Sequence, residues 1–206
     1  NGALRNLVQG GTYRLNTSYG IIIDGAGGGH NRIRGVQITS PTGNGITISA
    51  DVGQVLSFND IEGCFIESPS LLGITLSRAS FAKVRGNIIT RAGNQGIWLG
   101  GGAGISNDNL IDGNTLVDSG LAANNTYDHI HIAGGQRNLV TRNTLRNPGA
   151  PPGAQFAIRV EDNDNIIKGN DVRQSCAQES KISVTGTGCT VLDNDGWQLP
   201  VSIGSA

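Results

Sequence analysis

An asparagine recurs through most of the chain at an almost constant interval. It stands in the pattern apolar-x-x-Asn-x-apolar, and its copies follow one another at nearly equal steps: Asn59, Asn87, Asn114, Asn143, Asn170 and Asn194. Self-similarity at a period of roughly 20 to 50 residues is typical of repeat proteins, in which one unit buries its apolar face only by stacking on the next. The repeat therefore predicts a solenoid.

A second element shares this period and alternates apolar with polar residues. Its copies are Gly45–Ile48, Gly73–Leu76, Gly96–Leu99, His129–Ile132, Ala157–Val160 and Lys181–Val184. Alternation with period two is typical of a strand with one buried face. With 32 glycines and no methionine among its 206 residues, the chain favours turns over helices. We expect an all-β fold, a parallel β-helix of about seven coils with three short strands each, as one domain over residues 1–206.

The repeating asparagine has a structural explanation. Asn tolerates the left-handed backbone conformation of a tight bend, and its amide can bond to the Asn of the neighbouring coil. A lesser column of the same kind is expected five residues earlier, at Asn31, Asn109, Asn138 and Asn165. Both columns describe the scaffold, so candidate functional residues have to be sought at other positions.

Short glycine motifs carry a family resemblance. The stretch Gly10–Leu15 precedes the repeats, and Gly-Asn bends recur at Gly86-Asn87, Gly113-Asn114 and Gly169-Asn170. In these features nearly the whole chain resembles the pectate-lyase-like superfamily of right-handed, single-stranded parallel β-helices, most of all a bacteriophage tailspike or polysaccharide depolymerase domain. That superfamily includes polysaccharide lyases, glycoside hydrolases, uronate epimerases and tailspikes, so the resemblance implies a polysaccharide partner without choosing a reaction. For a tailspike it also implies a homotrimer, an extracellular or virion-surface location, and a segment of a longer chain.

Insertions in a solenoid tend to collect on its working face. Between the first strand of a coil and the asparagine, the segment from Ile97 to Asn114 is longer than its equivalents because of the loop Gly100–Gly104. Long return segments precede three later first strands, through Asn59–Ile74, Ser119–Tyr127 and Pro148–Pro152. We expect these loops to frame a groove over the first strands of the middle coils.

The outward residues of the first strands form one column: Thr47, Thr75, Trp98, His131, Arg159 and Ser183. Neighbouring strands lie about 4.8 Å apart, so Trp98, His131 and Arg159 are expected to be adjacent. The flanking candidates are His129, Lys181 and Glu161 at neighbouring outward positions, with Tyr127 and Asp128 at the entry of the His131 strand. An indole that stacks on a sugar, beside imidazole, guanidinium and carboxylate groups, predicts a carbohydrate site.

A lyase or an epimerase is one reaction that suits this set. It removes the proton next to a uronate carboxylate, which requires a base and a cation that stabilises the enolate. Arg159 is the expected cation, His131 or His129 is the expected base, and Tyr127 is a candidate proton donor. The run Tyr127-Asp128-His129 is similar to the Tyr, Asp and His set of alginate epimerases but lacks their Asp-Pro-His spacing. The epimerase therefore stays open.

A glycoside hydrolase is the other reaction, and it places two carboxyl groups roughly 5 to 10 Å apart across the scissile bond. Asp128 and Glu161, on adjacent coils, are the expected pair, with Asp162 in reserve. The run Glu161–Asn165 lacks the full loop pattern of a calcium site and fits an ordinary turn. We expect neither a metal nor a cofactor, with calcium at this run as the minor alternative.

Charge and hydropathy argue against other partners. A net charge of -1 gives no basic cluster for nucleic acid, and apolar runs such as Ile21–Ile23 are far too short to span a bilayer. A non-enzymatic shaft or adhesin is the competing class. We favour a polysaccharide-binding and polysaccharide-degrading domain, in which the expected substrate-binding residues are Trp98, Tyr127, Lys181 and Asp162.

Overall fold

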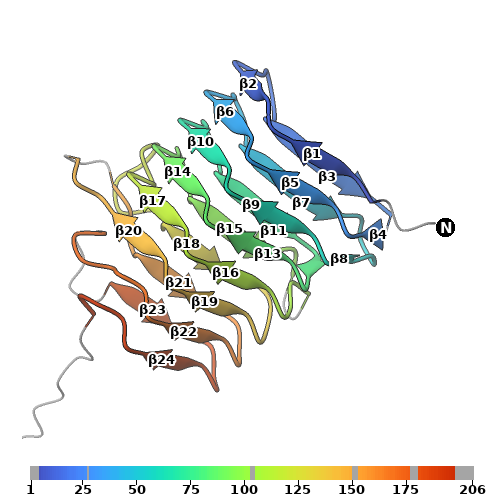
Figure 1. The fold of residues 1–206 in the computed structure, drawn as a ribbon. Coiled ribbons are helices and arrows are strands. Elements are labelled where there is room, and N and C mark those ends of the chain that lie inside the picture. The colour runs from blue at the N-terminus through green and yellow to red at the C-terminus, as the bar shows by residue number, and fades with distance from the viewer. Residues whose placement is uncertain (1–4, 27, 103–104, 150–152, 177–180, 198–206) are drawn as a thin grey trace, which may run out of the picture.

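The computed structural model describes residues 5–26, 28–102, 105–149, 153–176 and 181–197. Within these ranges the regular structure consists of 24 short strands and contains no helix. It follows that the described residues include no helix long and apolar enough to cross a membrane. The strands wind in coils that stack along one axis, from the N-terminal coil in blue to the C-terminal coil in red (Figure 1).

Equivalent strands of successive coils form three long sheets and one short one. Sheet A holds β1 (Leu7–Gln9), β5 (Arg32–Arg34), β9 (Asp60–Glu62), β13 (Lys83–Arg85), β16 (Leu110–Asp112), β19 (Leu139–Thr141), β22 (Ile166–Lys168) and β24 (Thr190–Leu192). Sheet B holds β2 (Thr12–Arg14), β6 (Gln37–Thr39), β10 (Phe65–Glu67), β14 (Ile88–Thr90), β17 (Thr115–Val117) and β20 (Thr144–Arg146). Sheet C holds β3 (Ile21–Gly25), β7 (Ile46–Ala50), β11 (Ile74–Ser77), β15 (Ile97–Gly100), β18 (Ile130–Ile132), β21 (Ile158–Val160) and β23 (Ile182–Val184). Sheet D holds β4 (Gly28–Gly29), β8 (Leu56–Ser57) and β12 (Ala79–Ser80).

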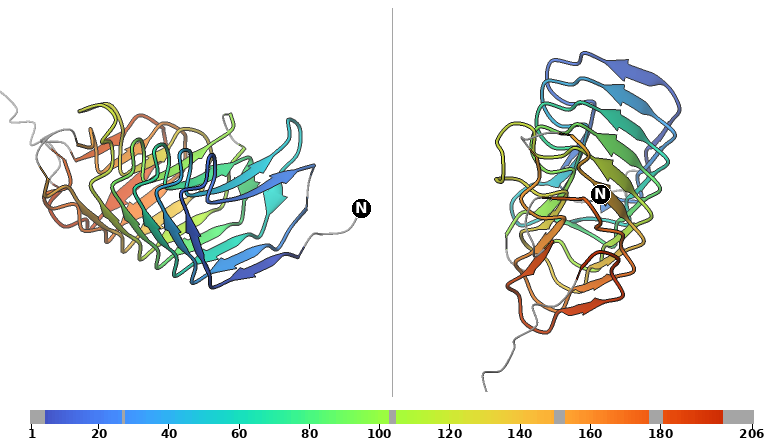
Figure 2. Two further views of the ribbon diagram at one scale, coloured as in Figure 1. Left: turned by 90° about the horizontal axis from the view of Figure 1, so that it is seen from above. Right: turned by 90° about the vertical axis from the view of Figure 1, so that its left-hand side faces the viewer.

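Every strand pairs in parallel with the equivalent strand of the next coil. In sheet A, for example, β5 pairs with β9 and β9 with β13, so one full coil separates hydrogen-bonded neighbours. Connections between parallel strands of one sheet are right-handed in nearly all proteins. The prediction of a right-handed, single-stranded parallel β-helix of about seven coils is confirmed, and Figure 2 shows the coils stacked side by side along the axis.

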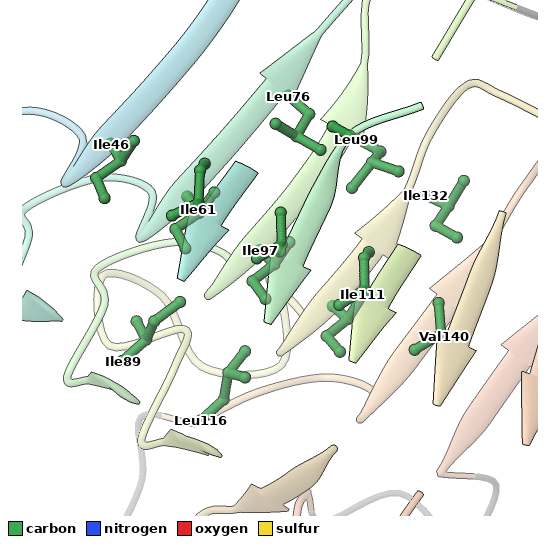
Figure 3. Close-up of a cluster of buried hydrophobic side chains, with 14 of the residues drawn as sticks. Ile46, Ile61, Leu76, Ile89, Ile97, Leu99, Ile111, Leu116, Ile132 and Val140 are labelled. Atoms are coloured by element: carbon green, nitrogen blue, oxygen red, sulfur yellow. The ribbon is translucent and has the colours of Figure 1, made fainter. Parts of the chain in front are cut away.

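Stacked aliphatic columns fill the interior of the coils. Ile97 of sheet C, Ile111 of sheet A and Leu116 of sheet B are all fully buried members of one cluster (Figure 3). Burying one such side chain contributes about 1.5 to 3 kcal/mol relative to leaving it exposed. The alternation that buries these columns turns the intervening residues of each strand outward, and this positions the polar column of sheet C.

Two buried asparagine ladders tie the coils together, as predicted. At the bend between sheets A and B, Asn114 Nδ2 donates to Asn143 Oδ1 over 2.9 Å. At the entry to sheet A, Asn109 Nδ2 donates to Asn138 Oδ1 over 3.0 Å. The left-handed conformation, however, belongs to the residue before each asparagine, such as Gly113 with φ of 63°.

The assignment of Asn59 to the main asparagine column is wrong. Asn59 Oδ1 accepts a hydrogen bond from Asn31 Nδ2 over 2.8 Å, so Asn59 belongs to the ladder at the entry to sheet A. Cys64 occupies the bend of that coil, and its amide donates to Asn87 Oδ1 over 2.9 Å. Leu56, three residues before Asn59, happens to complete the apolar pattern of the other column.

This register changes where the loops lie. Because Cys64 occupies the bend of this coil, the return segment runs from Cys64 to Ile74 and is as short as the return from Asn87 to Ile97. The additional residues of this coil lie in the segment from Ile46 to Cys64. The predicted long return loop ahead of β11 is therefore wrong. The long segments before β18 and β21 keep their predicted places in the chain. Part of two predicted loops, at residues 103–104 and 150–152, lies outside the described residues.

Candidate functional site

The outer face of sheet C carries the polar column in the predicted register. Trp98 of β15 pairs with His131 of β18, and His131 pairs with Arg159 of β21. Thr75 and Ser183 continue the column on either side. Trp98 and Arg159 are half-buried, and His131 is 9% exposed. The predicted adjacency of indole, imidazole and guanidinium is confirmed.

His131 lies between two carboxylates, one near each ring nitrogen. Nδ1 is 3.6 Å from Asp128 Oδ2, and Nε2 is 3.5 Å from Glu161 Oε2. Glu161 Oε1 in turn forms an ion pair with Arg159 Nη2 over 2.7 Å. We call Asp128, His131, Glu161 and Arg159 the charged row. It runs from Asp128, whose side chain is 1% exposed, to Glu161, whose side chain is 34% exposed.

Burial shifts the proton affinities of both Asp128 and His131. Loss of solvation raises the pKa of Asp128 to about 6, against the opposing effects of the Phe156 amide and the Arg159 charge. Loss of solvation also lowers the pKa of His131, and the Glu161 charge partly opposes that shift. The two shifts act in opposite directions, so burial favours the protonated carboxyl group of Asp128 and the neutral imidazole of His131.

A second position of the same fold explains why Asp128 lies beneath His131. Asn44 stands three residues before Thr47, as Asp128 does before His131, and both side chains accept a backbone amide of the next coil, over 3.1 and 3.0 Å. Asn44 Nδ2 then donates to Thr47 Oγ1 over 3.0 Å. The matching atom of Asp128, Oδ2, has no hydrogen-bond partner among the described residues. The same scaffold position therefore has its hydrogen bonds satisfied as Asn44 in one coil, and as Asp128 in another coil it presents a carboxylate oxygen to the imidazole of His131.

Trp98 owes its orientation to a glycine two residues later. A Cβ atom at Gly100 would lie 2.1 Å from two carbons of the indole ring, so the ring covers a position that only glycine leaves open. The ring is half-buried, with surface left to contact a sugar. Gln95, which the sequence analysis did not identify, places Nε2 3.4 Å from His131 Nδ1.

The predicted outward position of His129 is wrong. This side chain is fully buried, with Nδ1 3.0 Å from Ser119 Oγ and Nε2 2.9 Å from the Ser175 carbonyl oxygen. Burial lowers the pKa of His129 to about 4, so the ring is neutral near pH 7. Equivalent positions in other coils hold Gly73 and Gly96, where an added Cβ would meet the core, and these small residues were the signal of an inward position.

Other candidates lie apart from the charged row or beneath it. Asp162 is buried and accepts the backbone amides of Gly135 and Asn163 over 2.8 Å each, so it stabilises a turn. Lys181 and Tyr127 are half-buried at the edges of sheet C. Asp128 is too enclosed to flank a scissile bond opposite Glu161, which corrects the expected pair of exposed carboxylates.

Neither hollow measured on the surface includes the column of sheet C. Hollows of about 660 and about 520 Å³ open over residues of sheet A and its turns. Among the described residues, no group of three His, Cys, Asp or Glu side chains could hold a metal ion. The charged row is therefore a shallow surface site built from one imidazole, one guanidinium and two carboxylates.

Comparisons with known proteins agree with this architecture. Residues 3–124 match the family model described as a right-handed β-helix region. A solved structure named glycoside hydrolase superposes with a TM-score of 0.67 at 14% identity, covering 89% of this chain and 35% of that chain. The catalytic domain of a GH87 α-1,3-glucanase in complex with nigerose gives a TM-score of 0.48 at 12% identity, covering 91% of this chain and 52% of that one. A search of curated proteins finds no match.

Proposed function

The chain belongs to the right-handed β-helix family, and from this premise we propose that it binds a polysaccharide across the outer face of sheet C and hydrolyses it. The observation that carries the proposal is the charged row. Glu161, its exposed carboxylate, is held by Arg159 on one side and approached by His131 on the other. Trp98, on the neighbouring strand, supplies an apolar surface on which a sugar ring can stack.

The ion pair of Arg159 favours hydrolysis over a lyase reaction. A lyase needs a cation that is available to the uronate carboxylate, but the guanidinium of Arg159 already bonds to Glu161 over 2.7 Å. Hydrolysis needs an acid at the glycosidic oxygen and a base for the attacking water, and Glu161 can supply each function in turn, while the second carboxyl group, Asp128, acts through His131. This chain spans only 35% of the structure named glycoside hydrolase, with which it shares the fold, so the choice of reaction rests on the ion pair.

In this mechanism a proton from Asp128 reaches Glu161 through the imidazole of His131. Protonated Glu161 donates to the glycosidic oxygen as the bond to the anomeric carbon breaks. A water then attacks that carbon, and the Glu161 carboxylate takes up the proton of the water. Trp98 positions the sugar, Arg159 holds Glu161 in place, and Asp128 acts through His131 without touching the substrate.

A tailspike-like trimer is the finer form of this proposal. Leu110, Leu139 and Ile166 are consecutive neighbours in one outward column of sheet A, and Ile166 is 40% exposed. An apolar stripe on the outside of a sheet supports association of identical chains. Such an assembly would act outside the cell or on a virion. Light scattering of the purified chain tests this assembly. A trimer is the expected result, and a strict monomer at high concentration would contradict it.

The proposed reaction is tested by incubating the protein with a panel of bacterial polysaccharides. Chain length and absorbance at about 235 nm are followed together, because a lyase forms an unsaturated product that absorbs there. Shortening without a rise in absorbance is the expected result. Shortening with a rise would show a lyase, and binding without shortening would show the non-enzymatic class. Ser183→Ala, in the same column but outside the charged row, is the control for Glu161→Gln.

A further inference from the structure

A hollow of about 660 Å³ opens on the outer face of sheet A, over β1, β5, β9 and β13. Its lining joins an aromatic edge to charged positions of the sheet: His30, Phe58 and Phe81 on one side, and Arg32, Asp60 and Lys83 on the other. None of these residues belongs to the charged row, and sheets A and C are separate layers of the coil (Figure 1). The hollow is therefore a second surface with its own chemistry.

The aromatic edge holds a backbone conformation that its side chains disfavour. His30, Phe58 and Phe81 have φ of 59°, 58° and 55°, a region whose occupation costs a bulky residue about 1 to 3 kcal/mol. In later coils the same left-handed turn position is held by Asp108, Arg137 and Asp164, so the turn belongs to the scaffold and the aromatic side chains are what differs in the first coils.

Burial does not offset this strain. The rings of His30, Phe58 and Phe81 stack at centroid distances of 5.0 and 5.1 Å, yet Phe58 and Phe81 remain 52% and 46% exposed. The exposed edges of these rings are therefore candidates for ligand contact.

The charges around the hollow are only partly balanced. Arg32, Asp60 and Lys83 are consecutive neighbours in one outward column of sheet A. Asp60 turns to the adjacent column, where its Oδ2 pairs with Arg34 over 3.0 Å and with Arg85 over 3.1 Å. Arg32 and Lys83 are exposed and form no ion pair with a described residue. Two uncompensated cations thus stand on either side of Asp60, roughly 10 Å apart at two strand spacings.

Polar atoms beneath the hollow also lack partners among the described residues: Arg34 Nε, Asp60 Oδ1 and Asn59 Nδ2. Asn59 is 1% exposed, and Ala82 occupies the next coil where another asparagine would continue its ladder. An unmet buried polar group costs about 1 to 3 kcal/mol. Unmet donors and an acceptor thus lie buried beneath the lining of the hollow, and the exposed groups above them are the ones that can touch a ligand.

We propose that this hollow is a second saccharide site, which binds an oligosaccharide bearing carboxylates. Arg32 and Lys83 bind two carboxylates of the ligand, and the edges of Phe58 and Phe81 contact the C–H surface of a sugar ring. A neutral glycan leaves both cations without partners, and a small free anion leaves the aromatic edge unused. The site holds a ligand and needs no reaction, so it is independent of hydrolysis on sheet C.

Calorimetric titration with an oligogalacturonate at low salt tests the proposal. The titration is made in the Trp98→Ala protein, so that sheet C contributes least to the signal. Binding is expected to persist there and to weaken about tenfold or more when Arg32→Gln and Lys83→Gln are added, since each removes a charge-assisted contact. Lys168→Gln is the matched control, because Lys168 is an exposed cation on β22 of the same sheet, outside the hollow. The control is expected to bind unchanged.

The proposal is overturned by absence of oligogalacturonate binding, by equal binding after loss of both cations, or by equal binding of a neutral cello-oligosaccharide. Acetate at the same carboxylate concentration is the probe for a simple anion sink, and full displacement by acetate also counts against a saccharide site. Polysaccharide cleavage in Glu161→Gln tests the proposal for sheet C, and oligogalacturonate binding tests the proposal for the hollow on sheet A. Either result can fail while the other holds, so the two proposals are tested separately.

Discussion

The outer faces of sheets C and A use charged residues in opposite ways. On sheet C, His131 is enclosed between Asp128 and Glu161, and Glu161 is paired with Arg159. On sheet A, the cations beside the hollow are exposed, and the aromatic rings stand in solvent. Enclosed groups whose pKa values are shifted by burial suit proton transfer, whereas exposed unpaired cations suit the capture of an anion. The comparison separates a surface that can do chemistry from one that can only bind.

The residue type at one scaffold position produces part of this difference. Three residues before the outward residue of a sheet C strand, Asn44 donates a hydrogen bond to Thr47, whereas Asp128 places a buried carboxylate against His131. The position does not depend on the length of the connection, since the return from Val36 to Ile46 is short and the return from Asn114 to Ile130 is long. An acid at this position is thus what sets the His131 strand apart.

The largest expected effect is the loss of turnover in Glu161→Gln. Removing an acid and base from the reacting oxygen lowers the rate by about 10² to 10⁴, whereas binding of oligogalacturonate to sheet A stays as in wild type. Initial rates on a confirmed polysaccharide measure the first effect and calorimetry measures the second. Turnover within a few-fold of wild type would remove the charged row from the mechanism.

The next effect is a pH-dependent gain of stability in Asp128→Asn. The pKa of Asp128 is raised from 3.8 to about 6 in the folded protein, so its contribution to stability is fully present below about pH 4 and is lost as pH rises through 6. Asn cannot ionise, so the variant does not lose this contribution. Its free energy of unfolding is expected to exceed that of wild type by up to about 3 kcal/mol at pH 7 and to differ little at pH 4. Urea unfolding at the two pH values measures it.

Asp60→Asn is the matched change on sheet A. Because Asp60 pairs with Arg34 and Arg85, its replacement should lower the free energy of unfolding at pH 7 by about 1 kcal/mol. The buried His129 has the opposite pH dependence: the free energy of unfolding falls as the pH drops from 6.5 towards 4, because the buried ring resists protonation. This contribution is the same in wild type and in both variants, so it cancels in the differences between them. Equal signs for the two substitutions would break the comparison between the sheets.

A smaller effect is expected when the indole of Trp98 is displaced without being removed. Gly100→Ala places a Cβ where the ring now lies and should turn it off the sheet, weakening saccharide binding on sheet C several-fold, as Trp98→Ala does. The melting temperature should change little, since outward residues add little to the core. Ser183→Ala, in the same column, is the control. Unchanged binding in both variants would exclude stacking on Trp98.

The smallest effect is expected for Phe58→Asn at the edge of the other hollow. Asn tolerates the left-handed conformation, so relief of strain offsets the loss of stacking on His30 and Phe81. The free energy of unfolding should stay within about 1 kcal/mol of wild type, while oligogalacturonate binding weakens. A large loss of stability would show that the aromatic edge is structural.

The sequence was sufficient for the strands and for the order of the polar column, because an alternating pattern fixes which residues face outward once strands stack in register. It was insufficient at Asn59, where Leu56 completed the apolar pattern of the wrong column. It was also insufficient at His129. This residue precedes β18, which begins at Ile130, so the alternation of the strand does not determine where its side chain points.

The surface of sheet A was missed for a different reason. His30, Phe58 and Phe81 recur at the residue before the minor asparagine column, but a turn residue carries no alternation that tells where its side chain points. Its meaning depends on the left-handed backbone and on Arg32 and Lys83 beside it. Such information comes from the stacking of coils and is absent from any single repeat.

The most direct test of the account is a crystal structure of the Glu161→Gln protein with an oligosaccharide of a confirmed substrate. The account predicts a sugar ring stacked on Trp98 with its glycosidic oxygen next to residue 161, on the outer face of sheet C. A substrate chain seated on any other face, with the residues of the charged row uncovered, would contradict it.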